Sequence, residues 1–220
     1  MNEHVRIFLR PVGTPIALGM GAIFIGTVML SGLQLEWLHG ADEQRTVGFI
    51  ALAAAFPLEL LASILAFLAR DALAGTGLGI FSSIWSVVGL SLITGEPGST
   101  NDALGMFLVV AAVLLALLLV SAGASRLVLG VMIATGCARL LLSGLYEIKA
   151  TTGLEHAAGV VGLVLAAVCA YGIVALLMED LPRGAPLPVG RSGRAASSVA
   201  GGFGEQLEGL QHEAGVRRQL

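Results

Sequence analysis

The chain has few charged and few aromatic residues for its length. Only 12% of its 220 residues are charged and 5% are aromatic, whereas 56% are hydrophobic. With a mean hydropathy of +0.89, this composition excludes an ordinary soluble domain and predicts a multi-pass protein of the cell (plasma) membrane. The net charge of −3 is small, and no run of basic residues indicates binding to nucleic acid.

The chain also lacks the residue sets that form metal sites, disulfide frameworks or hydrolytic centres. Its two cysteines, Cys137 and Cys169, fall inside hydrophobic segments, where they are expected to be small buried side chains. The four histidines fall in expected loops or at helix ends (His4, His39, His156 and His212). We therefore expect no metal, no cofactor and no enzymatic activity.

Six hydrophobic runs have the composition and approximate length of membrane-spanning helices. They cover about residues 16–33, 46–69, 78–93, 104–120, 127–146 and 157–178. The expected fold is an all-α bundle of six transmembrane helices within residues 16–190. A short polar segment, 1–15, precedes the bundle, and a flexible tail rich in Gly, Ser and Ala, 191–220, follows it.

Basic residues divide unequally between the two sides that these helices define. One side holds Arg6, Arg10, Arg70, Arg126, Arg183, Arg191, Arg194, Arg217 and Arg218. The other side holds only Arg45 and Lys149. Because cytoplasmic loops carry the excess of Lys and Arg, both termini are expected in the cytoplasm.

Helix 46–69 contains two unusual residues, Pro57 and Glu59. Pro57 removes one helical hydrogen bond and leaves the carbonyl group of Ala53 without its usual donor. Glu59 lies far from both ends of the helix, and ionisable side chains at such depth usually face the bundle interior. We expect a structural or path-lining role for Glu59; the alternative is a misplaced helix boundary.

Helix 127–146 contains a second ionisable residue, Arg139. Its long side chain either extends to the membrane interface or turns inward to meet an acid or an anionic solute. We favour the inward orientation. The resulting hypothesis is that Glu59 and Arg139 face each other across a path for small monocarboxylates.

Helix 78–93 follows a glycine-rich re-entry, residues 72–79, whose Gly75, Gly77 and Gly79 indicate a tight turn and a closely packed helix start. Within the helix, Ser86 lies three residues after Ser83 and four after Ser82, so the three hydroxyl groups share one face. Either this face lines a polar path, or the hydroxyl groups bond back to their own helix.

The last hydrophobic helix and the turn after it carry a specific pattern. It reads His156-x-Ala158-Gly159-x-x-Gly162-Leu163, then Tyr171, and it closes on Leu187-Pro188-Val189-Gly190. This pattern resembles the acetate uptake transporter family, the YaaH-type succinate/acetate permeases. Pro15 corresponds to the second proline of that family's N-terminal motif, but the preceding Asn is missing, so the chain is similar to a divergent member.

The resemblance implies transport of acetate or a similar small acid through a six-helix protomer with its own pore. It also implies association of the protomers into a hexamer within the lipid bilayer. Phe81 is similar to the first residue of the family's Phe-x-Ser-Tyr-Gly segment. Gly21, Ile84 and Thr135 fall where the family has the aromatic and aliphatic residues that narrow its pore.

Two other functions are compatible with the same composition. One is a urea or amide channel of the AmiS/UreI type, whose neutral solute would not need Arg139. The other is a non-transporting membrane subunit, in which Glu59 and Arg139 would be purely structural. Proton coupling and the direction of flux are left open.

Overall fold

The protein is described by a computed structural model that covers residues 13–122, 126–179 and 187–190. These residues form α1 (Ile16–Gln34), α2 (Ala41–Ile50), η1 (Ala51–Ala55), α3 (Phe56–Leu68), α4 (Ala72–Thr94), α5 (Asp102–Ala122), α6 (Leu127–Lys149) and α7 (Thr152–Glu179). The segments α2, η1 and α3 are continuous, so the helices provide six candidate membrane spans. The predicted all-α architecture with six spans is confirmed.

Several helices are longer than the hydrophobic runs predicted. The second span begins at Ala41 instead of Thr46, and the fifth helix continues to Lys149 instead of ending at Tyr146. The last helix begins at Thr152, five residues before the predicted start. Polar residues at these ends continue the helices past the apolar membrane core, which hydropathy alone does not detect.

The glycine-rich segment is helical, so the predicted turn over 72–79 and the predicted helix start at residue 78 were wrong. Helix α4 begins at Ala72 and includes all three glycines. Asp71 stabilises this start, because its side chain accepts a 3.1 Å hydrogen bond from the backbone N–H of Ala74. The glycines of α4 instead permit close packing: a Cβ atom at Gly75 would lie 2.9 Å from the ring of Phe67.

The proline in the second span is accommodated by a short π-helix. The segment η1 ends two residues before Pro57, and the backbone N–H of Phe56 bonds to the carbonyl group of Ala51, five residues back. The wider turn is the usual way in which a helix absorbs an interruption of its hydrogen bonding. Pro57 therefore lies in the first turn of α3, a position that tolerates proline.

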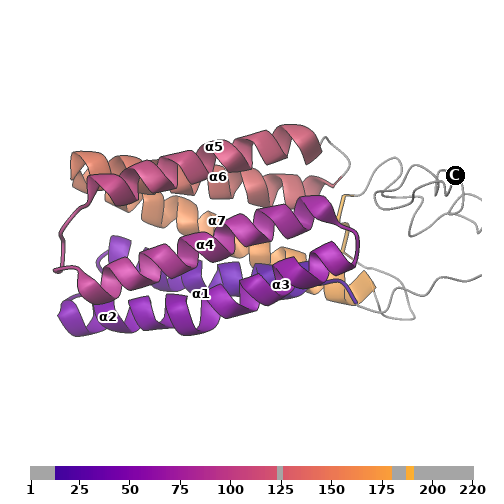
Figure 1. The fold of residues 1–220 in the computed structure, drawn as a ribbon, viewed down its shortest axis with the longest axis horizontal. Helices are drawn as coiled ribbons and strands as arrows, with labels where there is room; N and C mark the ends of the chain where they lie inside the picture. Colours follow the sequence, from indigo (N-terminus) through magenta and orange to yellow (C-terminus); the bar gives the residue numbers. More distant parts are fainter. Residues whose placement is uncertain (1–12, 123–125, 180–186, 191–220) are drawn as a thin grey trace, which may run out of the picture.

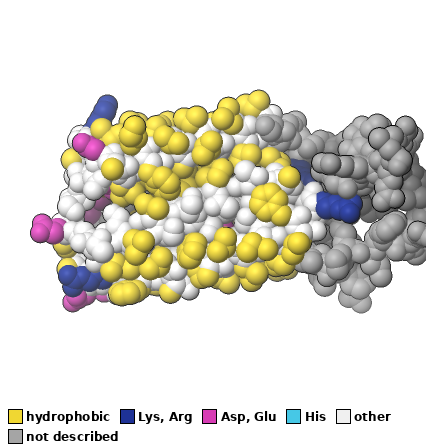
Figure 2. All heavy atoms as spheres, viewed as in Figure 1, with side chains coloured by type: hydrophobic (Ala, Val, Ile, Leu, Met, Phe, Trp, Pro, Cys, Tyr) yellow, Lys and Arg dark blue, Asp and Glu magenta, His cyan; other side chains and the backbone are white. Residues whose placement is uncertain are grey.

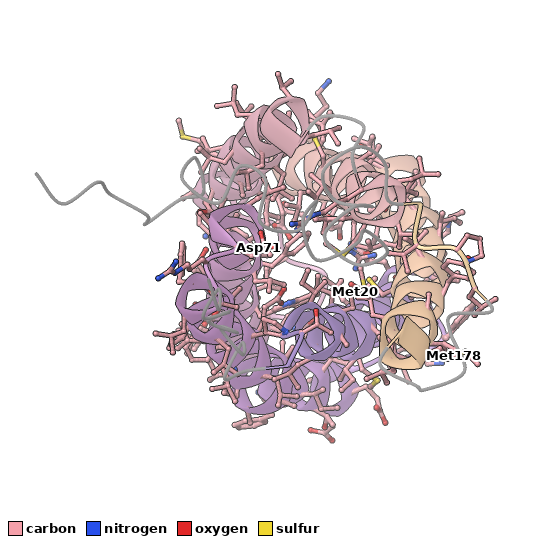
Figure 3. All side chains as sticks on the ribbon, turned by 90° about the vertical axis from the view of Figure 1, so that its right-hand side faces the viewer. Met20, Asp71 and Met178 are labelled. Carbon is pink, nitrogen blue, oxygen red and sulfur yellow. The ribbon has the colours of Figure 1, made fainter. Side chains whose placement is uncertain are left out.

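The six spans run side by side as one elongated bundle (Figure 1), and buried apolar side chains fill much of its interior. Helix α7 packs against both α1 and α6, α5 packs against α6, and α3 packs against α4. Figure 3 looks along the bundle and shows Met20 in its interior. Glycines bring neighbouring helices close together: a Cβ atom at Gly105 would lie 2.8 Å from the carbonyl oxygen of Gly144, across the contact of α5 with α6.

The outer surface carries a broad apolar band between two charged ends. Figure 2 shows hydrophobic side chains along the length of the visible face and charged side chains at its ends. Large apolar side chains such as Leu61, Leu117 and Val160 are exposed on the isolated chain. Such a surface is stable in contact with lipid, and the chain is a multi-pass membrane protein.

Candidate functional site

A cavity of about 90 Å³ enters the bundle from one end. Its mouth is polar and includes Gln44, Glu96 and Glu147. We call this end of the bundle the Glu147 end, and the opposite end, which carries Asp71 and Arg126, the Asp71 end. The cavity volume is several times the roughly 10–15 Å³ that one water molecule needs, so the cavity has room for a small solute.

Arg139 lies in the wall of this cavity. Its side chain is 3% exposed, which confirms the inward orientation and rules out extension to the interface. The Nη1 atom donates to Ser31 Oγ at 2.9 Å and to the carbonyl oxygen of Ala158 at 3.2 Å. The Nη2 atom has no hydrogen-bond partner among the residues that the structure describes. The guanidinium group is therefore fixed through one terminal nitrogen, while the other is buried without a partner in the described part of the chain.

Three polar residues of α1 face Arg139 across the interior. Thr27, Ser31 and Gln34 are spaced at i, i+4 and i+7, so they share one side of an otherwise apolar helix. Gln34 Nε2 donates to Ser143 Oγ at 3.3 Å, and Ser143 lies one turn beyond Arg139 on α6. Two polar contacts, Ser31 with Arg139 and Gln34 with Ser143, thus link α1 to α6.

Three residues that line this cavity each have a buried polar atom with no partner in the described part of the chain. These atoms are Thr27 Oγ1, Gln34 Oε1 and Arg139 Nη2. Buried polar atoms are nearly always hydrogen-bonded, so a cluster of unpaired atoms indicates a place for water or a ligand. The sequence analysis did not select Thr27, Ser31, Gln34 or Ser143. Their helical spacing on α1 was the available signal.

Glu59 lies behind the cavity wall and is fully buried, with 0% exposure. Its Oε2 atom accepts a 2.7 Å hydrogen bond from Trp85 Nε1, whereas Oε1 has no partner within residues 13–122, 126–179 and 187–190. Trp85 lines the cavity and Glu59 does not. Glu59 is thus an interior residue, as expected, and it is hydrogen-bonded to Trp85, which lines the cavity.

The hypothesis that Glu59 and Arg139 face each other is not supported by a direct contact in the structure. Among the described residues, each of the two side chains bonds to other groups and no ion pair joins them. Each group instead bonds to a different neighbour: Trp85 donates to one carboxyl oxygen of Glu59, and Ser31 and the carbonyl group of Ala158 accept from one guanidinium nitrogen of Arg139.

Several other predicted path residues lie outside the cavity. Ser83 is exposed and bonds to the carbonyl oxygen of Ile80 at 2.6 Å, and Ser86 bonds to that of Ser83 at 2.8 Å. Thr135 bonds back to Val131 and Met132 of its own helix. A Cβ atom at Gly21 would meet no atom within 4 Å. The hydroxyl groups follow the alternative of bonding back to their own helices.

Phe81 and Ile84 do line the cavity, together with Trp85. The Phe81 ring packs on α6 at Gly136, where a Cβ atom would lie 2.7 Å from Cζ. Ser82, the third hydroxyl of the predicted face, is buried and donates to the carbonyl oxygen of Phe56 at 3.3 Å. The aromatic and aliphatic side chains of α4 thus form one wall of the cavity, opposite the polar side of α1.

A second, smaller cavity of about 30 Å³ lies at the Asp71 end. It is lined by Met20, Leu129 and Arg126, among others, and Arg126 forms an ion pair with Asp71. On α1, Ile23 lies between Met20 of this cavity and Thr27 of the larger one, and it is 0% exposed. On α6, Met132 has the corresponding position between Leu129 and Arg139. Buried apolar side chains therefore separate the two cavities.

The residues of the last-helix pattern have structural contacts. Segment 187–190 covers the start of α6, because the carbonyl oxygens of Gly190 and Val189 accept hydrogen bonds from the first backbone N–H groups of that helix, at 3.0 and 3.4 Å. Tyr171 Oη donates to the carbonyl oxygen of Pro188 at 2.8 Å. These contacts join α7 to α6 at the Asp71 end.

Two further pattern residues, His156 and Gly159, lie near the start of α7. His156 Nε2 lies 3.9 Å from Glu36 Oε1 on a partly exposed surface. Gly159 allows α7 to approach the end of α1, since its Cβ atom would lie 2.8 Å from Leu35 Cγ. Pro15 precedes the first residue of α1. The predicted tail, 191–220, and most of segment 1–15 lie outside the described residues.

Comparison with known proteins agrees with this fold. A family model described as the GPR1/FUN34/yaaH family matches residues 2–182. The acetate transporter protein patA of Aspergillus clavatus is 28% identical over 188 residues, which cover 78% of this chain and 76% of that protein. The bacterial acetate channel SatP has a similar fold, with a TM-score of 0.71 and 17% identity, over 81% of this chain and 99% of the other. The chain therefore belongs to the GPR1/FUN34/yaaH family, in agreement with its last-helix pattern.

Proposed function

We propose that this protein carries acetate or a similar small monocarboxylate across the cell membrane, through a path inside each protomer. The observation that carries the proposal is the unpaired Nη2 atom of Arg139 in a cavity of about 90 Å³. Its relatives are named an acetate transporter and an acetate channel. By this kinship the protein is a membrane transporter or channel and not an enzyme.

The chemistry of the cavity supports an anionic ligand. An arginine inside a membrane protein is costly unless it has partners, and such residues usually mark ion or substrate paths. Guanidinium groups bind carboxylates through charge-assisted hydrogen bonds, which are about twice as strong as neutral ones. In this protein Arg139 Nη2 and the hydroxyl group of Thr27 are donors that a carboxylate could use.

In the proposed route, the solute enters at the Glu147 end, binds at Arg139 and leaves at the Asp71 end. Phe81 and Ile84 form the wall beside the binding position. Ile23 and Met132 must move to connect the two cavities, because both are buried between them. In this route Trp85 lies against the solute, and Glu59 fixes the indole ring of Trp85 by accepting a hydrogen bond from its N–H group.

Charge distribution supports an orientation for this route. Arg70 and Arg126 lie at the Asp71 end, together with Arg residues of the N- and C-terminal segments by sequence, whereas Arg45 and Lys149 lie at the other end. By the excess of positive charge in cytoplasmic segments, the Asp71 end and both termini face the cytoplasm in this proposal. The exposed apolar side chains of α3 and α5 are compatible with association of protomers, as the resemblance to hexameric permeases implies.

A urea or amide channel is the rival within the same physical class. A neutral amide would gain hydrogen bonds from the cavity but would leave the charge of Arg139 uncompensated, so the guanidinium group favours an acid. A purely structural subunit is the other rival. It would give no account of a cavity with three unpaired polar atoms.

The experiment is uptake of labelled acetate into vesicles that contain only this protein. We expect uptake above that of empty vesicles, inhibition by unlabelled acetate, and no inhibition by urea or formamide at equal concentration. An imposed pH gradient separates a proton-linked carrier, whose uptake the gradient accelerates, from a channel, whose uptake it does not. Absence of uptake, or stronger inhibition by the amides, would contradict the proposal.

A further inference from the structure

The binding position contains an acceptor that a simple carboxylate cannot satisfy. Of the three unpaired atoms, Arg139 Nη2 and Thr27 Oγ1 can donate, but Gln34 Oε1 can only accept. Gln34 is 6% exposed and lines the cavity. The carboxylate group of acetate offers oxygen acceptors and no donor, so it would leave Gln34 Oε1 without a partner of its own.

The acceptor lies on the mouth side of Arg139. Ser31, which holds Arg139 Nη1, is three residues before Gln34 on α1. Ser143, which holds Gln34 Nε2, is four residues after Arg139 on α6. Both helices run toward the Glu147 end, so the Gln34–Ser143 contact lies about one helical turn, roughly 5–6 Å, nearer the mouth than the Ser31–Arg139 contact.

This arrangement fixes how a small acid would lie. With its carboxylate on Arg139, the rest of the solute extends toward the mouth, where Oε1 of Gln34 is the next unpaired atom. A hydroxyl group on the carbon beside the carboxylate can donate to an acceptor at that position. Gln34 is itself held by Ser143, so its amide group is already oriented when the solute arrives.

We propose that this site prefers small 2-hydroxy monocarboxylates over the corresponding acids without the hydroxyl group, and that Gln34 determines the preference. The inference rests on the proposed function in one respect, that a carboxylate binds at Arg139. A buried acceptor that stays unpaired lowers affinity, and a site built to bond a hydroxyl group discriminates against ligands that lack it. The expected preference is about three- to tenfold, the worth of one net hydrogen bond.

Binding can be measured without transport, because the cavity contains its own reporter. The chain has two tryptophans; Trp85 lines the cavity and Trp37 is 62% exposed. In a Trp37→Phe protein, Trp85 is the one remaining tryptophan, so a change in its fluorescence reports occupancy of the cavity. The probes are two pairs matched in carbon number: glycolate against acetate, and lactate against propionate.

We expect glycolate to bind Trp37→Phe protein three- to tenfold more tightly than acetate, and lactate more tightly than propionate. Replacing Gln34 by Met removes the acceptor at similar length and should bring both ratios close to one. Ser86→Ala is the matched control, because Ser86 bonds only to its own helix outside the cavity, and it should keep both ratios.

Equal affinities within both pairs in the protein that retains Gln34 would overturn the inference, since a water molecule would then satisfy Oε1 as well as a hydroxyl group does. A preference that persists in Gln34→Met would overturn the role of Gln34. If that variant does not fold, the ratios in the parent protein still decide. Acetate uptake with equal affinities would reject this inference alone, whereas hydroxy-acid binding without any acid uptake would reject the proposed transport.

Discussion

Gly162 of α7 provides the space that the guanidinium group of Arg139 occupies. A Cβ atom on Gly162 would lie 1.4 Å from Arg139 Nη1 and 2.3 Å from Ser31 Oγ. No side chain can be accommodated there while Arg139 keeps its hydrogen bonds. Gly162, a residue of the last-helix pattern, thus leaves room for the guanidinium group because it has no side chain.

We predict that Gly162→Ala strongly reduces acetate uptake, by tenfold or more, because Arg139 must leave its position. The charge-assisted hydrogen bonds that hold Arg139 contribute about 1.5–3 kcal/mol each, so losing them is sufficient for a tenfold reduction. Uptake into vesicles, normalised to the amount of folded protein, provides the measurement.

Gly153→Ala is the matched control on the same helix. A Cβ atom at Gly153 would meet no atom within 4 Å, so uptake by this variant should equal that of the unmodified protein. If Gly162→Ala transported acetate as well as Gly153→Ala does, the described position of the Arg139 guanidinium group against Gly162 would be contradicted.

The separation of Glu59 from Arg139 predicts the outcome of a charge exchange. Glu59 bonds to Trp85, and Arg139 bonds to Ser31 and Ala158. Exchanging the charges, Glu59→Arg with Arg139→Glu, should therefore rescue neither single variant and should leave the folded yield at or below that of the poorer one. Recovery of yield or uptake in the double variant would indicate direct pairing.

The hydrogen bond of Trp85 to Glu59 predicts an energetic coupling between them. Trp85→Phe removes the donor and leaves the second carboxyl oxygen of Glu59 unpaired. We expect this to lower the free energy of unfolding by about 1–3 kcal/mol, in addition to the loss caused by the smaller size of the Phe ring. A double-mutant cycle with Glu59→Leu, measured by denaturant unfolding in detergent, isolates that coupling. Additive effects of the two substitutions would show that the hydrogen bond contributes nothing to stability.

The contact of Gly190 with α6 predicts a loss of stability on substitution. Gly190 has φ = +68°, and its Cβ atom would lie 2.5 Å from Leu127 Cβ. Gly98 has a similar φ of +73° but open space around it. Both Gly→Ala variants incur a backbone strain of roughly 1–3 kcal/mol. Thermal unfolding should therefore show a larger loss of stability for Gly190→Ala than for Gly98→Ala, and the difference measures the steric clash with Leu127. Equal losses would contradict the described packing of segment 187–190.

The sequence allowed prediction of the number of spans, the all-α class and the family, because long apolar runs and a spaced motif report these directly. It also indicated that Glu59 and Arg139 lie inside the bundle, since ionisable residues at membrane depth seldom face lipid. The start of α4 was missed, because glycines within a membrane helix resemble a loop in sequence while they permit close packing in the structure.

Most of the cavity could not be predicted from single segments. Ser31 and Gln34 come from α1, and their hydrogen-bond partners on α6, Arg139 and Ser143, are more than 100 positions away in sequence. Ser83, Ser86 and Thr135 looked equally suitable, because periodicity places hydroxyl groups on one face without saying which way that face points.

Uptake of acetate by the unmodified protein and by Arg139→Met tests the central claim most directly, since methionine keeps much of the length and removes the charge. The Ser83→Ala variant serves as the control, because Ser83 lies on the outer face. We predict that acetate uptake falls by at least tenfold in Arg139→Met and is unchanged in Ser83→Ala. Full acetate uptake by folded Arg139→Met protein would contradict the claim that Arg139 binds the solute.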